Sequence, residues 1–117
     1  MRPAPLLLVL VLSLWQLAQG LAMRFEMVEP ETVRPIHIGV GVLTALILLG
    51  LVRSARIEGG RIGSDLTFVF LLMILQGLAG LFILAEISLA TIIHLALSFF
   101  VVGSVAATLI LAVSETG

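Results

Sequence analysis

Four long runs of apolar residues, separated by short polar segments, make up most of this chain. The runs are Pro5–Met23, Ile36–Val52, Leu66–Ala85 and about Ala90–Val113, and they predict helices over about 5–23, 36–54, 65–85 and 89–113. Each approaches or exceeds the ~17–20 residues that cross a ~30 Å hydrocarbon layer as a helix. None of them alternates apolar and polar residues with a period of two, as a strand of a membrane β-barrel would. The pattern therefore predicts four transmembrane helices.

The connections between the runs are short and carry nearly all of the charged residues. They are Arg24–Pro35, Arg53–Asp65 and Glu86–Leu89. Short connections force consecutive helices to run antiparallel. Pro35 suits the first turn of the second helix, where its missing N–H costs nothing. We expect an all-α fold, an integral membrane four-helix up-down bundle that forms a single domain over residues 1–117.

The first run has a second interpretation as a targeting segment. Arg2, the apolar stretch Leu6–Trp15 and the small-residue sequence Ala18-Gln19-Gly20 are similar to a secretory signal peptide with its cleavage site. The run is also long enough to span a bilayer, and the four-helix prediction takes it as a membrane helix.

Composition strengthens the membrane assignment and removes several classes of function. The chain is 61% hydrophobic and 11% charged, whereas soluble domains are about 45–50% apolar and about 25% charged. A net charge of −1 argues against nucleic-acid binding. Because the chain has no cysteine, thiol redox chemistry and thiolate metal sites are excluded. Any redox activity would require a bound cofactor.

The arginines predict an orientation in the membrane. Four of them fall on one side of the predicted bundle, namely Arg2, Arg53, Arg56 and Arg61, and only Arg24 and Arg34 fall on the other. Cytoplasmic segments carry the excess of positive charge. We therefore expect the N-terminus and the C-terminus inside, in the plasma membrane of a prokaryote.

Two histidines are the clearest candidates for chemistry. His37 and His94 each lie just inside the start of an apolar run. Ionisable side chains at membrane depth are costly and usually have a function. The second and fourth helices of an up-down bundle run in the same direction, so both imidazoles should lie at the same depth. Two such histidines facing each other suit the axial positions of one haem iron, which predicts one haem b per chain with His37 and His94 as metal ligands.

Residues near the histidines offer further cofactor contacts. Gly41 and Gly77 would let a flat ring approach a helix backbone, although glycines at such positions more often serve helix packing. Arg34 and Arg24 lie at the same membrane end and are candidates to pair with the haem propionates. The other neighbours are two aromatic residues that could wall a pocket and three acidic residues that could orient an imidazole, namely Phe99, Phe100, Glu29, Glu31 and Glu86.

The second half of the chain resembles the haem A synthase family. The resemblance is carried by Leu75-Gln76-Gly77-Leu78-Ala79-Gly80-Leu81 and, after a short turn, His94-Leu95-Ala96-Leu97-Ser98-Phe99-Phe100. It covers about residues 34–112 and implies a half-size version, a single four-helix bundle with His37 and His94 as haem ligands. The family places a catalytic glutamate three residues before the first histidine, where this chain has Arg34. Many bacterial members also have an external cysteine pair that is absent here. The resemblance thus implies haem binding more directly than hydroxylation of a haem methyl group.

Several functions fit these features. The first is a haem b protein with two histidine ligands that transfers electrons, as a small subunit of a respiratory membrane complex. The alternatives are a half-size haem A synthase-like enzyme and a cofactor-free accessory membrane subunit. A proton-coupled transporter is disfavoured because no carboxylate lies in the middle of a run. The expected partners are membrane lipid and either a larger membrane protein complex or further copies of the chain.

Overall fold

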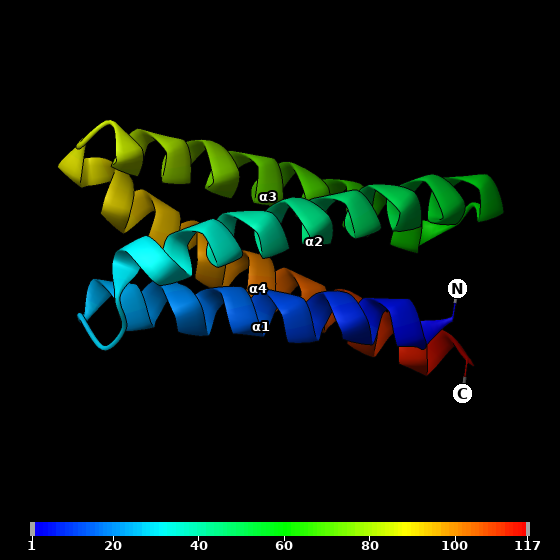
Figure 1. Cartoon of the computed structure of the whole chain (residues 1–117). Coiled ribbons are helices and arrows are strands. Elements are labelled where there is room, and N and C mark those ends of the chain that lie inside the picture. The colour runs from blue at the N-terminus through cyan, green and yellow to red at the C-terminus, as the bar shows by residue number, and fades with distance from the viewer. Residues whose placement is uncertain (1, 117) are drawn as a thin grey trace.

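The computed structural model describes residues 2–116 as four antiparallel helices (Figure 1). They are α1 (Pro3–Arg24), α2 (Pro30–Glu58), α3 (Arg61–Leu84) and α4 (Ser88–Thr116). All four are long and apolar enough to cross a membrane. The expected four-helix up-down bundle is confirmed, and the chain is an integral membrane protein. Both termini and the α2–α3 turn lie at one end, the terminal end; the α1–α2 and α3–α4 connections lie at the other, the histidine end.

The helices form a four-cornered bundle. α1 and α3 each pack against both α2 and α4, and over residues 2–116 neither α1 with α3 nor α2 with α4 makes a close backbone contact. The second and fourth helices are therefore diagonal neighbours across the interior. This arrangement places His37 and His94 on opposite sides of the bundle axis.

The second helix begins earlier than the sequence pattern predicted. It starts at Pro30 rather than near residue 36, with Pro30 in the first helical turn and Pro35 inside the helix. Pro30 starts the helix at no cost in hydrogen bonds, and Pro35 removes only one backbone bond near the helix start. The expectation that Pro35 lies in the first turn is therefore wrong. His37 lies two turns inside α2.

The third helix also begins earlier, at Arg61 rather than about residue 65. Gly59 and Gly60 have φ of 82° and 91°, and they form the whole turn between α2 and α3. These backbone angles are accessible to glycine without steric cost, which lets the chain reverse in two residues. Arg61 Nε lies 3.5 Å from Asp65 Oδ2, one helical turn later. This ion pair supports the additional first turn of α3.

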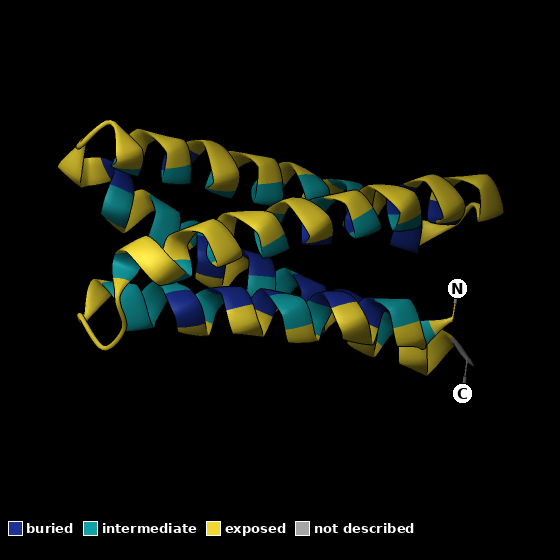
Figure 2. Cartoon of the chain, viewed as in Figure 1, coloured by how far each residue is buried: buried dark blue, intermediate teal, exposed yellow. Residues whose placement is uncertain are grey.

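The interior of the bundle is divided along its length. The terminal half is filled by a cluster of buried apolar side chains, namely Leu6, Val9, Leu48, Val52, Ala55, Ile62, Leu66, Val69, Val101, Val105 and Ala112. The histidine half instead buries polar side chains from three helices. Each of the four helices has an exposed face on the outside of the bundle (Figure 2). Most side chains on these faces are apolar, for example Leu46 and Ile110. Such a surface suits contact with lipid chains or another membrane protein.

Candidate functional site

The two histidines meet inside the histidine half of the bundle. Their ring centroids are 6.2 Å apart, and the ring planes are inclined by 77°. His37 is seven residues from the start of α2, and His94 is six residues from the start of α4. At 1.5 Å per residue these distances correspond to about 10 Å and about 9 Å of helix. The structure thus brings together two rings that the sequence separates by more than fifty residues.

The ring of His94 is held by a short chain of hydrogen bonds. Its Nδ1 lies 2.8 Å from the backbone carbonyl of Gln76 on α3. The Gln76 side-chain amide donates to Ser98 Oγ at 3.1 Å, and that hydroxyl donates to the carbonyl of His94 at 2.7 Å. A carbonyl only accepts, so Nδ1 carries the proton in this contact and Nε2 is left with a free lone pair. This is the tautomer that a metal-binding histidine uses when its other nitrogen is held by a carbonyl.

His37 is held through its backbone rather than through its ring. The Gln16 side-chain amide of α1 donates to the His37 carbonyl at 2.7 Å. The ring Nδ1 is buried and has no hydrogen-bond partner within residues 2–116. A Cβ on Gly41 would lie 3.1 Å from Gln16 Nε2. The role of Gly41 in the structure is therefore to give the Gln16 amide room to reach the carbonyl.

Two other glycines lie against the imidazole rings. A Cβ on Gly20 of α1 would lie 3.8 Å from Cε1 of His37, and one on Gly80 of α3 would lie 3.2 Å from Cε1 of His94. Gly77, which we expected near the cofactor, is exposed, and a Cβ there would meet no atom within 4 Å. Gly80, nearly one turn further along α3, is the glycine beside the ring.

The two halves of the chain repeat each other, which sequence reasoning missed. Helix α1 matches α3 with an offset of 60 residues, and α2 matches α4 with an offset of 57 residues. The matched positions are Leu6 and Leu66, Val9 and Val69, Gln16 and Gln76, Gly20 and Gly80, His37 and His94, Leu48 and Val105, and Ala55 and Ala112. The repeat is visible in the sequence as a pattern that occurs twice: a glutamine, a glycine four residues later, and a histidine near the start of the following helix. Each helical hairpin thus contributes one equivalent imidazole.

One difference between the hairpins explains their different hydrogen bonds. Ser98 follows His94 by four residues, and Gly41 occupies the same position after His37. In the second hairpin the Ser98 hydroxyl lies between the glutamine amide and the histidine carbonyl. In the first hairpin Gly41 offers no hydroxyl at that position, and the Gln16 amide reaches the carbonyl directly.

The other predicted neighbours lie outside the imidazole pair. Arg24 ends α1 and Arg34 lies in the second turn of α2; both are exposed at the histidine end. Phe99 and Phe100, which could have walled a pocket or faced lipid, face outward and are more than half exposed. Within residues 2–116, none of the three acidic candidates, Glu29, Glu31 and Glu86, bonds an imidazole; the backbone of Gln76 takes that role for His94.

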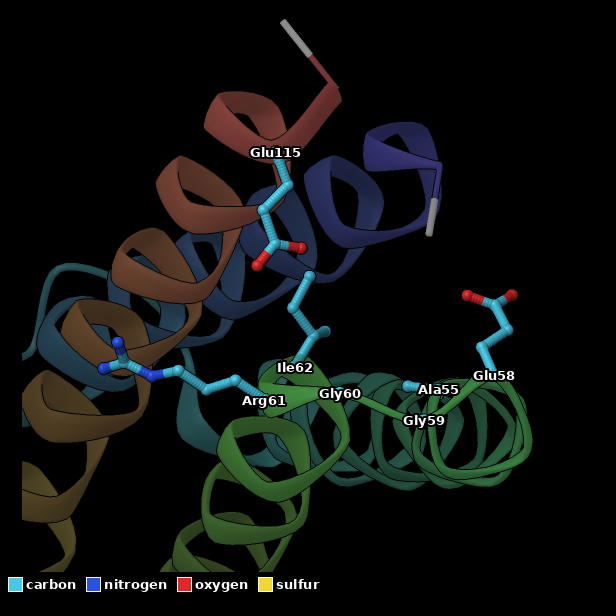
Figure 3. A pocket seen from close by; sticks show the side chains of 7 residues that line it. All are labelled: Ala55, Glu58, Gly59, Gly60, Arg61, Ile62 and Glu115. Atoms are coloured by element: carbon cyan, nitrogen blue, oxygen red, sulfur yellow. The ribbon is translucent and has the colours of Figure 1, made fainter.

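A small hollow lies at the terminal end of the bundle (Figure 3). It has a volume of about 80 Å³ and lies where the α2–α3 turn meets the end of α4. Its lining residues are Ala55, Glu58, Gly59, Gly60, Arg61, Ile62 and Glu115. The apolar half of the bundle separates this hollow from the imidazole pair.

The donor set limits what the imidazole pair can hold. Among residues 2–116 no group of three or more histidine, aspartate or glutamate side chains is placed to hold a metal ion. Two imidazoles fill only half of the four positions that a structural zinc site requires. A metal bound by these two imidazoles would therefore need its remaining ligands from a cofactor that carries it.

Fold and site together define a membrane four-helix bundle with a half-buried pair of imidazoles at equivalent positions of its two hairpins. No protein family, curated protein or solved structure matches the chain. The resemblance to the haem A synthase family therefore rests on the residues quoted for it.

Proposed function

We propose that this chain is a haem b protein in which His37 and His94 are the two axial ligands of one haem iron. The observation that carries the proposal is the 6.2 Å between the two ring centroids. A metal–imidazole bond is about 2 Å long and a ring nitrogen lies about 1 Å from the ring centre, so two imidazoles on opposite sides of one metal have centres about 6 Å apart. The spacing of the two ring centres agrees with this requirement.

The chemistry of the donors supports the same group. A porphyrin supplies four equatorial nitrogens, so a haem needs only two further ligands from the protein. The hydrogen bond from His94 Nδ1 to the Gln76 carbonyl leaves Nε2 for the metal. The Nδ1 of His37 has no hydrogen-bond partner within residues 2–116, so no such bond competes with a ligand for this nitrogen.

Electron transfer is the function that this ligation favours. A haem b with both axial positions filled exchanges single electrons and has no open position for oxygen. Arg34 stands where the haem A synthase family has its catalytic glutamate, and an arginine is neither a general base nor a carboxylate ligand. We therefore propose a small electron-transferring subunit of a larger respiratory membrane complex, with the exposed apolar surfaces meeting lipid and the partner subunits.

Arg34 is the better candidate to pair with a haem propionate. It precedes His37 by three residues, so the two side chains lie on the same side of α2, about one turn apart, at the histidine end. Arg24 ends the neighbouring helix at the same end and is the second candidate. Neither guanidinium has a polar partner within residues 2–116, and arginine binds carboxylates through two parallel hydrogen bonds.

An absorption spectrum of the purified protein tests the proposal. The protein, expressed with haem available, should show the sharp α and β bands of a low-spin haem b after reduction, with one haem per chain. Extracted haem with a hydroxyl or formyl group would instead favour the synthase-like alternative. Protein that stays colourless after addition of excess haem would contradict the proposal and favour an accessory subunit without a cofactor.

The proposed orientation, with both termini inside, is tested by cysteine labelling. The chain has no cysteine, so a single introduced thiol reports its own side of the membrane. In intact cells, a membrane-impermeant maleimide should label Met27→Cys, in the exposed α1–α2 connection, and should not label Glu115→Cys near the C-terminus. Both variants should be labelled after detergent is added. The reverse labelling pattern would place the histidine end in the cytoplasm.

A further inference from the structure

Two buried polar atoms near the imidazole pair lack partners within residues 2–116, and their chemistry is complementary. They are Nδ1 of His37 and Oε1 of Gln19. An unpaired polar group inside a membrane bundle is unfavourable, because no water is present to replace the missing hydrogen bond. When the Nε2 of a histidine binds a metal, its Nδ1 carries a proton and is a donor, whereas an amide oxygen only accepts.

The position of Gln19 brings it to the ring of His37. Gln19 is 8% exposed and lies on the inward face of α1. The next residue, Gly20, is the one whose Cβ would lie 3.8 Å from Cε1 of His37, the carbon between the two ring nitrogens. Gln16, on the same face of α1, already donates to the His37 carbonyl. The last two turns of α1, at the histidine end, therefore lie next to His37.

We propose that Gln19 Oε1 accepts the Nδ1–H of His37 when that histidine is bound to iron, which makes Gln19 a positioning residue for the first axial ligand. This inference rests on the proposed function. In the second hairpin the backbone carbonyl of Gln76 performs this task for His94. The position equivalent to Gln19 there is Ala79, which has no polar side chain. In this proposal a backbone carbonyl holds His94 and a side chain, which can be changed by mutation, holds His37.

The reduction potential of the haem reports this hydrogen bond. An acceptor on Nδ1 makes the imidazole a more basic ligand, which favours the oxidised iron and lowers the potential. Gln19→Leu should keep the low-spin spectrum and raise the potential, whereas Gln19→Glu, with a stronger acceptor, should lower it. Ser13→Ala is the matched control because Ser13 is also buried on α1 with an unpartnered oxygen, six residues or about 9 Å further along the helix. Its potential should equal that of the wild type.

The outcomes separate this inference from the function on which it rests. If both Gln19 variants bind haem at the wild-type potential, Gln19 is not the partner of His37, while haem ligation stands; the Gln16 carbonyl, equivalent to that of Gln76, would then be the acceptor. If Gln19→Leu fails to fold, Gln19→Glu decides by its potential alone, and an unchanged value overturns the inference. If the wild-type protein takes up no haem, the proposed function fails and the inference fails with it.

Discussion

Replacing both His37 and His94 by alanine should abolish haem binding while the four helices remain inserted in the membrane. The two imidazoles belong to the two histidines of the chain and are the proposed ligands of the iron. Loss of groups that only orient a metal ligand costs about 10–100-fold in metal affinity, so loss of both ligands should cost at least about 100-fold. The ratio of haem to protein after purification measures the loss. Far-ultraviolet circular dichroism and carbonate extraction of membranes should give wild-type values, because neither ring belongs to the apolar cluster of the terminal half.

A methionine variant distinguishes loss of a ligand from general damage to the site. Methionine also binds haem iron, and a histidine–methionine pair has a higher reduction potential than a pair of histidines. His94→Met should therefore restore low-spin haem binding relative to His94→Ala, with a potential above that of the wild type. A double-alanine variant that keeps the wild-type spectrum would mean that neither histidine is a ligand. It would leave the imidazole pair as a feature of packing alone.

The architecture was accessible from the sequence because hydrophobic length and short connections determine it. Four apolar runs joined by short polar segments leave few arrangements besides an up-down bundle. The predicted starts of α2 and α3 were wrong, because Pro35 and the Gly59-Gly60 pair suggested longer connections than the structure has. Proline and glycine disfavour the interior of a helix, but near its beginning they cost little. The approach of His37 to His94 followed from topology, since both lie within the first turns of parallel helices that start at the same end of the bundle.

The detailed surroundings of the two rings were not accessible, because they depend on the rotation of each helix about its axis. Nearly every position of α3 is apolar, so its sequence does not reveal which face turns inward. Gly77 and Gly80 differ by about 60° around such a helix, and only the packed structure separates them. Likewise, the acceptor for His94 is a backbone carbonyl, a group that every residue has. The internal repeat was the overlooked signal, because it pairs Gly80 with Gly20 and leaves Gly77 unmatched.

Substituting leucine for Gly80 should abolish or strongly weaken haem binding. Even a Cβ at this position would lie 3.2 Å from Cε1 and 3.4 Å from Nδ1 of His94. The ring cannot retreat without losing the 2.8 Å contact between Nδ1 and the Gln76 carbonyl, and the remaining atoms of leucine need still more space. We expect haem affinity to fall by at least about tenfold, which corresponds to about 1.4 kcal/mol. Titration of haem into the purified protein, followed by absorbance, measures the affinity.

The same substitution at Gly77 provides a matched control on the same helix. Gly77 is exposed, and a Cβ there meets no atom within 4 Å. Leucine also favours helix over glycine by up to about 1 kcal/mol. Gly77→Leu should therefore bind haem like the wild type and be no less stable to heating in detergent. The opposite order of effects, with Gly77→Leu losing the haem and Gly80→Leu keeping it, would mean that the cofactor approaches α3 from its outer face. In that case the imidazoles would not enclose the iron inside the bundle.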